Sequence, residues 1–153
     1  MQLLRFEHGR EAYCLKISDV SEVIETVEVV ALPRVPSQFE GIFQLRGRPV
    51  TLLNFARCFL EDACPEAGVT DQGSEILVFA EPRQHFGVRV PGSIEACDLD
   101  FESMEIPPTD SRISTVLDGV IKDQAMKVYN LLSADKIFLH AGNLIADKGG
   151  DRV

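Results

Sequence analysis

The sequence is poor in the residues from which catalytic and metal sites are usually built. Its 153 residues include no tryptophan, three histidines and four cysteines. The histidines His8, His85 and His140 lie far apart, and the closest cysteines, Cys58 and Cys64, lack the tight CxxC spacing of zinc ligands. The motifs GxxxxGKS/T, GxSxG and HExxH are also missing. We expect no catalytic residues, no metal and no cofactor, and therefore a protein that is not an enzyme.

Basic residues and long apolar runs are scarce as well. The chain has 15 basic against 24 acidic residues, a formal net charge of -9, which repels phosphate backbones and anionic lipids. No apolar run approaches the roughly 20 residues that span a bilayer, and the opening QLLRFEHG does not resemble a signal peptide. Without an export signal, the cysteines indicate reduced thiols. We expect a cytoplasmic protein with no nucleic-acid partner and no direct membrane insertion.

The residues that are present indicate a mainly β fold. Hydrophobic residues make up 45% and charged residues 25% of the chain, the balance of a soluble globular protein. Short apolar runs rich in β-branched and aromatic residues are separated by turn residues. These runs predict strands over Leu3–Glu7, Glu11–Ile17, Thr26–Leu32, Gly41–Leu45, Pro49–Phe55, Glu75–Ala80, His85–Val90, Ile94–Leu99, Thr115–Ile121 and Met126–Leu131. Helical patterns are few and short, over Ser18–Ile24, Ala56–Leu60 and Ala134–Leu139.

A polar segment, Glu61–Gly73, divides the chain nearly in half and has the composition of a linker. An offset of 73 residues aligns the first hairpin of each half, so that Phe6 falls on Phe79 and Glu22 on Glu95. One interpretation is that any two amphipathic hairpins match in this way, because alternation is common to all strands. The other is two similar small β units. Units of this size bury too little surface to be stable alone and would share an interface.

The stretch GIFQLRGRPV places Arg46 between an apolar run and Gly47. A guanidinium cannot lose its charge, so it either points into water or pairs with a carboxylate. Glu22, in the predicted helix SDVSEVIE, is the best candidate for an ion pair. The alternative is a capping box, in which Glu22 folds back on Asp19 at the start of that helix. The residues alone leave both interpretations open.

Several runs resemble the CheW family of chemotaxis coupling proteins. They are FEHGREAYCLKISDVSEVIE, FEGIFQLRGRPVTLLNFARCF, HFGVRVPGSIEACDL and GVIKDQAMKVYNLLSADKIF. The resemblance implies two small five-stranded SH3-like β-barrels packed together, with a few short helices. It implies one CheW-like domain over residues 1–140, made of intertwined barrels near 15–60 and 75–120 that the terminal strands complete. Residues 141–153 would then form a C-terminal tail, expected to fray.

The same resemblance implies a non-enzymatic adaptor. It would bind the cytoplasmic tip of chemoreceptors and the regulatory domain of a CheA-type histidine kinase, beside the membrane-bound receptors. The family's glutamate and arginine fall on Glu22 and Arg46, which favours the ion pair over the capping box. The implied partner-binding residues are Val20, Glu22, Val23, Leu45, Arg46 and Gly47.

The chain departs from the family pattern at Gln44, Thr51, Asn54 and Pro91. These departures suggest a divergent adaptor of a chemosensory system that controls pili, surface motility or gene expression. A different kind of function is also open, an SH3-like barrel that binds a small molecule in the groove between the barrels. Both alternatives keep the predicted fold.

Overall fold

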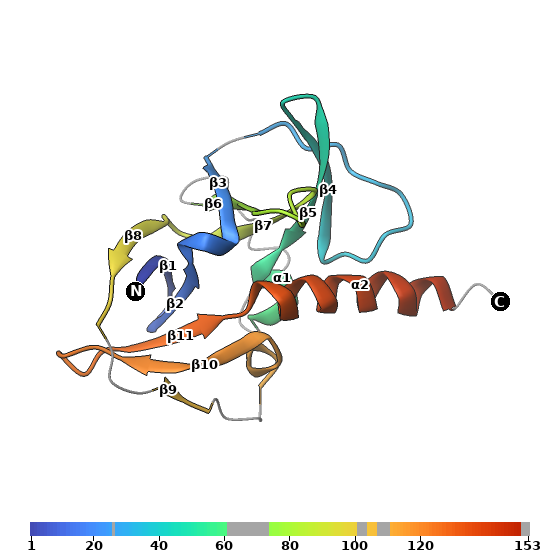
Figure 1. The fold of residues 1–153 in the computed structure, drawn as a ribbon. Coiled ribbons are helices and arrows are strands. Elements are labelled where there is room, and N and C mark those ends of the chain that lie inside the picture. The colour runs from blue at the N-terminus through green and yellow to red at the C-terminus, as the bar shows by residue number, and fades with distance from the viewer. Residues whose placement is uncertain (26, 61–73, 101–103, 107–110, 151–153) are drawn as a thin grey trace.

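The computed structural model describes residues 1–25, 27–60, 74–100, 104–106 and 111–150, and the segment Glu61–Gly73 lies outside these residues. Two sheets and two α-helices make up the fold (Figure 1). The elements in chain order are β1 (Gln2–His8), β2 (Glu11–Lys16), β3 (Val20–Ile24), β4 (Phe39–Leu45), β5 (Arg48–Asn54), α1 (Phe55–Phe59), β6 (Ser74–Phe79), β7 (Phe86–Pro91), β8 (Glu95–Asp98), β9 (Met104–Glu105), β10 (Leu117–Lys122), β11 (Val128–Leu132) and α2 (Ala134–Gly150). Short 3-10 turns cover Ile17–Asp19 and Ile113–Val116.

The six-stranded sheet has the order β8-β1-β2-β11-β10-β9, and the five-stranded sheet has the order β3-β6-β7-β5-β4. One parallel pair lies inside each sheet, β2 with β11 and β5 with β7, and the other neighbours are antiparallel. Among the described residues, no backbone pairing joins the two edge strands of either sheet. The predicted fold, mainly β with two small SH3-like units packed together and few helices, is confirmed, with six and five strands in the two sheets and no barrel closed by backbone pairing of the described residues.

The two halves of the chain exchange strands between the sheets. The hairpin β1–β2 takes the second and third places in the six-stranded sheet, and β6–β7 takes the same places in the five-stranded sheet. After each hairpin the chain crosses to the other sheet, where β3 pairs with β6 and β8 pairs with β1. The repeat is therefore visible in the topology. The five-stranded sheet is not built from residues 15–60 alone. It also contains β6 and β7, residues 74–91, which pair with β3 and β5 of the first half.

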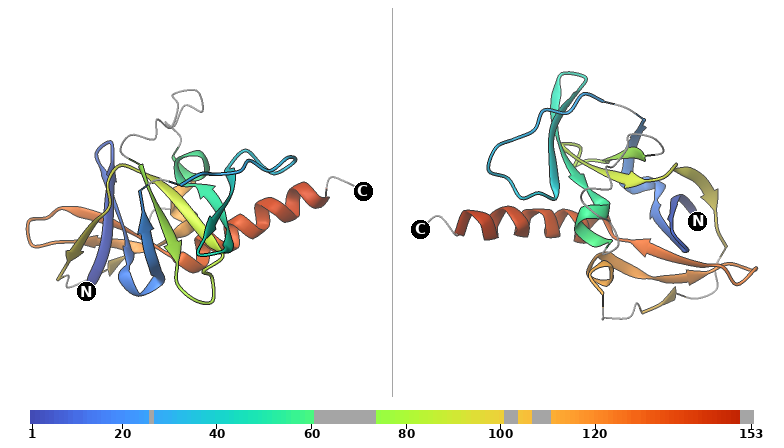
Figure 2. Two further views of the ribbon diagram at one scale, coloured as in Figure 1. Left: turned by 90° about the horizontal axis from the view of Figure 1, so that it is seen from above. Right: turned by 180° about the vertical axis from the view of Figure 1, so that it is seen from behind.

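The main hydrophobic core fills the space between the sheets. Phe6 and Tyr13 from the six-stranded sheet stack with ring centroids 5.3 Å apart. Phe55 at the start of α1 meets both rings edge-on, at 5.3 Å from Phe6 and 5.6 Å from Tyr13. Leu53, Leu77 and other apolar residues of the five-stranded sheet complete the same cluster. Apolar side chains therefore fill the space between the barrels, where the small-molecule alternative requires a groove. Figure 2 shows the two sheets on either side of α1 and the start of α2.

The predicted helix over Ser18–Ile24 is wrong. A single 3-10 turn ends at Asp19, and the following residues form strand β3. In β3 partly buried residues alternate with exposed ones, a period of two that fits a strand with one face toward the core. The capping box is therefore ruled out, because Glu22 is not near a helix start.

The expected strand over Thr26–Leu32 is also wrong over its described residues. Only Val30 pairs with β4, through one isolated bridge to Ile42, and residue 26 lies outside the described residues. Gly41 allows this approach, because its φ is +144° and a Cβ there would collide with the carbonyl oxygen of Val30. Beyond the bridge the chain turns away through Pro33.

Helix α2 is longer than the sequence predicts. It runs to Gly150 rather than Leu139, so most of the expected tail is helical. Ile137 and Ala141 are buried in the main core, and Leu144 packs against it. Ser133 caps the helix, because its Oγ accepts a hydrogen bond from the N–H of Lys136 at 3.2 Å. The last turns project beyond the sheets (Figure 1).

Candidate partner-binding site

The two edge strands of the five-stranded sheet meet through side chains at the β4–β5 hairpin. Arg46 Nη2, in the hairpin turn after edge strand β4, donates a hydrogen bond to Glu22 Oε1 on edge strand β3. The Glu22 side chain is 21% exposed and that of Arg46 is 76% exposed. Among the described residues, no backbone pairing joins edge strands β3 and β4, and we call the gap between them the seam. The contact bridges this seam, and most of the guanidinium still faces solvent.

The hairpin geometry fixes where Arg46 lies. Leu45 pairs with Arg48, so the turn has two residues, and both have positive φ, 51° for Arg46 and 79° for Gly47. Positive φ at both positions is the requirement of a type I′ turn, which matches the twist of the flanking strands. An arginine in this conformation is strained by about 1 to 2 kcal/mol relative to glycine. The position therefore carries a side chain at a cost in stability.

A hollow of about 360 Å³ lies beside this contact, between the hairpin and the turn that joins β6 to β7. Its wall includes Leu45 and Arg46, which the sequence predicted as site residues. Val20 packs against the main core, and Val23 is 40% exposed on β3. Gly47 is exposed at the tip of the turn. The remaining wall residues are Ser21, Arg48, Val50, Val78, Glu81 and Gln84.

Sequence reasoning missed these remaining wall residues for different reasons. Arg48 follows directly in the RGR run, so its sequence position was a usable signal. Ser21 was assigned to a helix, although it lies at an irregularity of β3 and its Oγ donates to the carbonyl oxygen of Val78 at 3.2 Å. No local pattern links Glu81 or Gln84 to the hairpin, because tertiary packing alone brings the β6–β7 turn there.

A buried polar network supports the base of the same hairpin. Arg89 on β7 is 6% exposed, and its Nε donates to Glu40 Oε2 on β4 at 2.7 Å. Asn54 Nδ2 donates to the same oxygen at 3.1 Å, while Asn54 Oδ1 accepts from the N–H of Arg57 and caps α1. Since β4, β5 and β7 all contribute, the network fixes the register at which the hairpin leaves the sheet. No local sequence pattern links Glu40 to Arg89.

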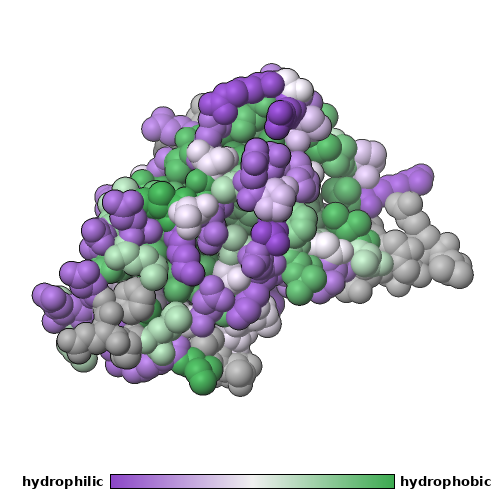
Figure 3. All heavy atoms as spheres, in the orientation of Figure 1, coloured by the Kyte–Doolittle hydropathy of each residue, from purple (hydrophilic) through white to green (hydrophobic). Residues whose placement is uncertain are grey.

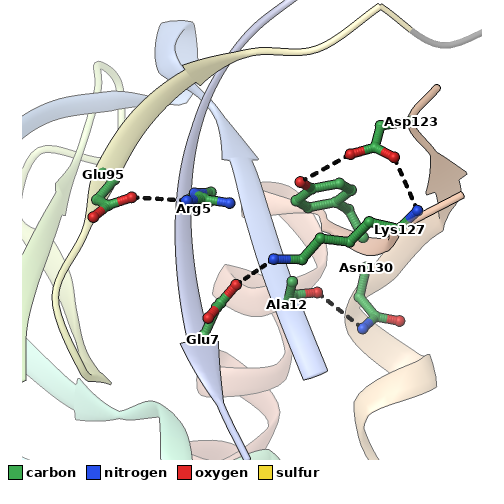
Figure 4. A network of polar contacts seen from close by, with 8 residues as sticks. Arg5, Glu7, Ala12, Glu95, Asp123, Lys127 and Asn130 are labelled. Atoms are coloured by element: carbon green, nitrogen blue, oxygen red, sulfur yellow. Dashed lines mark hydrogen bonds and ion pairs between the residues drawn. The ribbon is translucent and has the colours of Figure 1, made fainter. Parts of the chain in front are cut away.

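The rim of the six-stranded sheet carries a second set of polar contacts (Figure 4). Arg5 pairs with Glu95 at 2.9 Å, and Lys127 pairs with Glu7 at 2.5 Å. The second contact ties the β10–β11 hairpin to β1 across β2. Arg5 is 29% exposed and the other three side chains are 43% to 64% exposed, so water and salt screen both pairs and each contributes little to stability.

Two buried cysteines, Cys14 and Cys58, have little nucleophilic character. Burial raises the pKa of Cys14 and of Cys58 to about 12. The thiolate is the reactive form, so both thiols are unreactive near neutral pH. Within the described ranges, no three His, Cys, Asp or Glu side chains are grouped so that they could hold a metal ion. No helix of the described chain is long and apolar enough to cross a membrane.

Comparisons with known proteins agree on one family. Residues 2–142 match the CheW-like domain. The chemotaxis protein CheW of Treponema pallidum is 28% identical over 108 residues, which cover 70% of this chain and 63% of that protein, so the match spans less than two thirds of the relative. The crystal structure of the scaffolding protein TtCheW from Thermoanaerobacter tengcongensis is similar with a TM-score of 0.72 and 25% identity, covering 86% of this chain and 88% of that one. Because the family match extends over nearly the whole sequence, the chain belongs to the CheW-like domain family.

Proposed function

We propose that this protein is a non-enzymatic adaptor that couples chemoreceptors to a CheA-type histidine kinase, in chemotaxis or a related chemosensory pathway. The match to the CheW-like domain over residues 2–142 carries the proposal. The names of the two similar proteins, a chemotaxis protein and a scaffolding protein, support it. An adaptor of this kind works in the cytoplasm beside membrane-bound receptors.

In this proposal the receptor tip binds at the seam of the five-stranded sheet. The residues involved are Val20, Glu22, Val23, Leu45, Arg46 and Gly47. The contact between Glu22 and Arg46 holds the two edge strands together, and the exposed part of the guanidinium faces the partner. The kinase regulatory domain binds elsewhere, at the barrel ends. A CheW-like protein with two separate docking surfaces can hold both partners at once, which is what coupling requires.

A divergent adaptor for pili, surface motility or gene regulation uses the same surfaces with different partners. Asn54 gives this version some support, because it stands where the family pattern has an aspartate and donates to Glu40. The small-ligand alternative has weaker support. The space between the sheets is filled by the cluster around Phe6, Tyr13 and Phe55, and the hollows that remain are open and lie on the surface.

The test is direct binding of the purified chain to two probes, measured by isothermal titration calorimetry. The probes are the soluble cytoplasmic fragment of a chemoreceptor and the regulatory domain of a CheA-type kinase, both from the same organism. We expect saturable binding of each probe alone and of both together. Binding to neither probe refutes the coupling role. Binding to the kinase domain alone refutes the receptor half of the proposal.

A further inference from the structure

The hollow beside the β4–β5 hairpin has charges of opposite sign on its two sides. Arg48 is exposed, and among the described residues it has no ion-pair partner. Arg46, on the same side, is engaged by Glu22. The opposite side is formed by the β6–β7 turn, where Glu81 is exposed. A group that enters the hollow therefore meets a free cation on one side and an anion on the other.

The floor of the hollow is apolar. Val50 and Val78 are each 1% exposed and belong to the core cluster beneath the five-stranded sheet, and Leu45 packs against that cluster. Figure 3 shows hydrophilic side chains over the hairpin at the top of the molecule, with hydrophobic ones directly beneath them. The volume of about 360 Å³ is at the small end of the usual range for ligand pockets. An open site of this size with an apolar floor suits one or two side chains of a protein partner.

A polar group at the wall of the hollow lacks a partner. The Oε1 atom of Gln84 is buried and accepts no hydrogen bond from the described residues. A buried acceptor without a donor costs free energy, and rotation of the partly exposed Gln84 side chain toward a donor of a partner would remove that cost. Gln84 lies on the same side as Glu81, so both groups favour a donor there.

We infer that this hollow receives an apolar side chain of the receptor tip, flanked by a carboxylate that pairs with Arg48 and by a hydrogen-bond donor that meets Gln84 and Glu81. The inference rests on the proposed adaptor function and specifies the chemistry of its partner. Arg48 is the residue that determines affinity. Arg46 serves the seam, because its guanidinium is already bound to Glu22 across the two edge strands.

The opposite charges also set the orientation of the partner. Reversing the partner segment would place its carboxylate against Glu81 and its donor against Arg48, and like charges in contact are unfavourable. Since the protein carries a net charge of -9, an acidic partner segment approaches the molecule against the overall field. The unpaired cation of Arg48 supplies a local attraction at the docking point.

The test compares Arg48→Glu with Arg10→Glu, a matched reversal at the exposed tip of the β1–β2 hairpin. Calorimetry with the receptor fragment and the kinase regulatory domain is run at low and moderate salt. We expect Arg48→Glu to weaken receptor binding about tenfold, to flatten its salt dependence and to leave kinase binding unchanged. Arg10→Glu should change receptor binding less than about twofold.

Gln84→Leu gives a second, uncharged readout, because it removes the unpaired acceptor while keeping a side chain of similar length. We expect this variant to be at least as stable as the wild type and to bind the receptor fragment more weakly. Receptor binding by both variants within about twofold of wild type overturns the inference and leaves the adaptor function standing. Equal loss of kinase binding in a folded Arg48→Glu variant also overturns it. A wild-type chain that binds neither probe refutes the adaptor function, and the inference falls with it.

Discussion

Removing the carboxylate of Glu40 should destabilise the protein more than removing any exposed carboxylate of an ion pair. Glu40 accepts from Arg89 Nε at 2.7 Å, and the two side chains are 16% and 6% exposed. Glu40→Ala leaves the Arg89 guanidinium buried without this partner and also removes the acceptor of the Asn54 amide. Loss of one partner of a buried ion pair costs about 3 to 5 kcal/mol. For a domain of this length that corresponds to a decrease of roughly 6 to 20 °C in Tm.

The matched control is Glu95→Ala. Glu95 pairs with Arg5 at a similar distance, 2.9 Å, but its side chain is 64% exposed. Its loss should cost at most about 1 kcal/mol. Urea unfolding followed by far-UV circular dichroism measures both variants, since the chain has no tryptophan for fluorescence. The double variant Glu40→Ala with Arg89→Met should recover part of the lost stability, because it no longer buries a guanidinium that has lost the Glu40 carboxylate.

Two results contradict this reasoning. The first is a Glu40→Ala variant whose free energy of unfolding lies within about 1 kcal/mol of that of Glu95→Ala, which would mean that burial does not strengthen the pair. The second is a double variant less stable than Glu40→Ala alone, which would mean that Arg89 contributes mainly through its other contacts, including the hydrogen bond from Nη1 to Ser74 Oγ at 3.3 Å.

Three further predictions concern single positions. Arg46→Gly should leave the free energy of unfolding within about 1 kcal/mol of wild type, because relief of the positive φ offsets the lost exposed pair; a loss of 3 kcal/mol or more in urea unfolding would contradict this. Gly41→Ala should cost about 2 kcal/mol or more in the same assay, since the new Cβ meets the Val30 carbonyl, whereas Gly142→Ala in open space on α2 should stabilise by about 0.5 to 1 kcal/mol. Cys14 should resist iodoacetamide at pH 8 in the folded protein and react once it is unfolded, as read by mass spectrometry. Burial raises its pKa from 9.0 to about 12, so its contribution to stability is fully present below pH 9 and declines as pH rises toward 12.

Most strands were predicted from local patterns, because the hydrophobic periodicity of a strand and the turn residues that end it extend over only a few positions. The β4–β5 hairpin was predicted in this way, since Arg46-Gly47 separates two apolar runs. The segment after Lys16 was misassigned because its apolar spacing, Val20, Val23 and Ile24, fits one face of a helix as well as a strand. Pairing with β6, a long-range contact, decides between them.

The site was only partly predictable for the same physical reason. The contact between Arg46 and Glu22 was expected from a resemblance, not from spacing, because the two residues belong to opposite edges of a sheet. The Glu40–Arg89 pair could not be predicted, since its members are 49 residues apart in the sequence and neither lies in a motif. Helix α2 was predicted too short because it continues through Gly142 and Asn143, residue types that usually mark the end of a helix.

The strand exchange makes the seam between β3 and β4 a suitable place for the proposed docking surface. Each sheet takes its central hairpin from one half of the chain and its edge strands from the other, so the hydrophobic contacts that hold the halves together are already inside the core. The seam between β3 and β4 is bridged by a side-chain contact of Arg46 and not by backbone hydrogen bonds. Residues there, such as Arg48, can change without altering the register of any strand. If a partner binds at this seam, as we propose, substitutions there can change its identity while the exchanged hairpins keep the architecture constant.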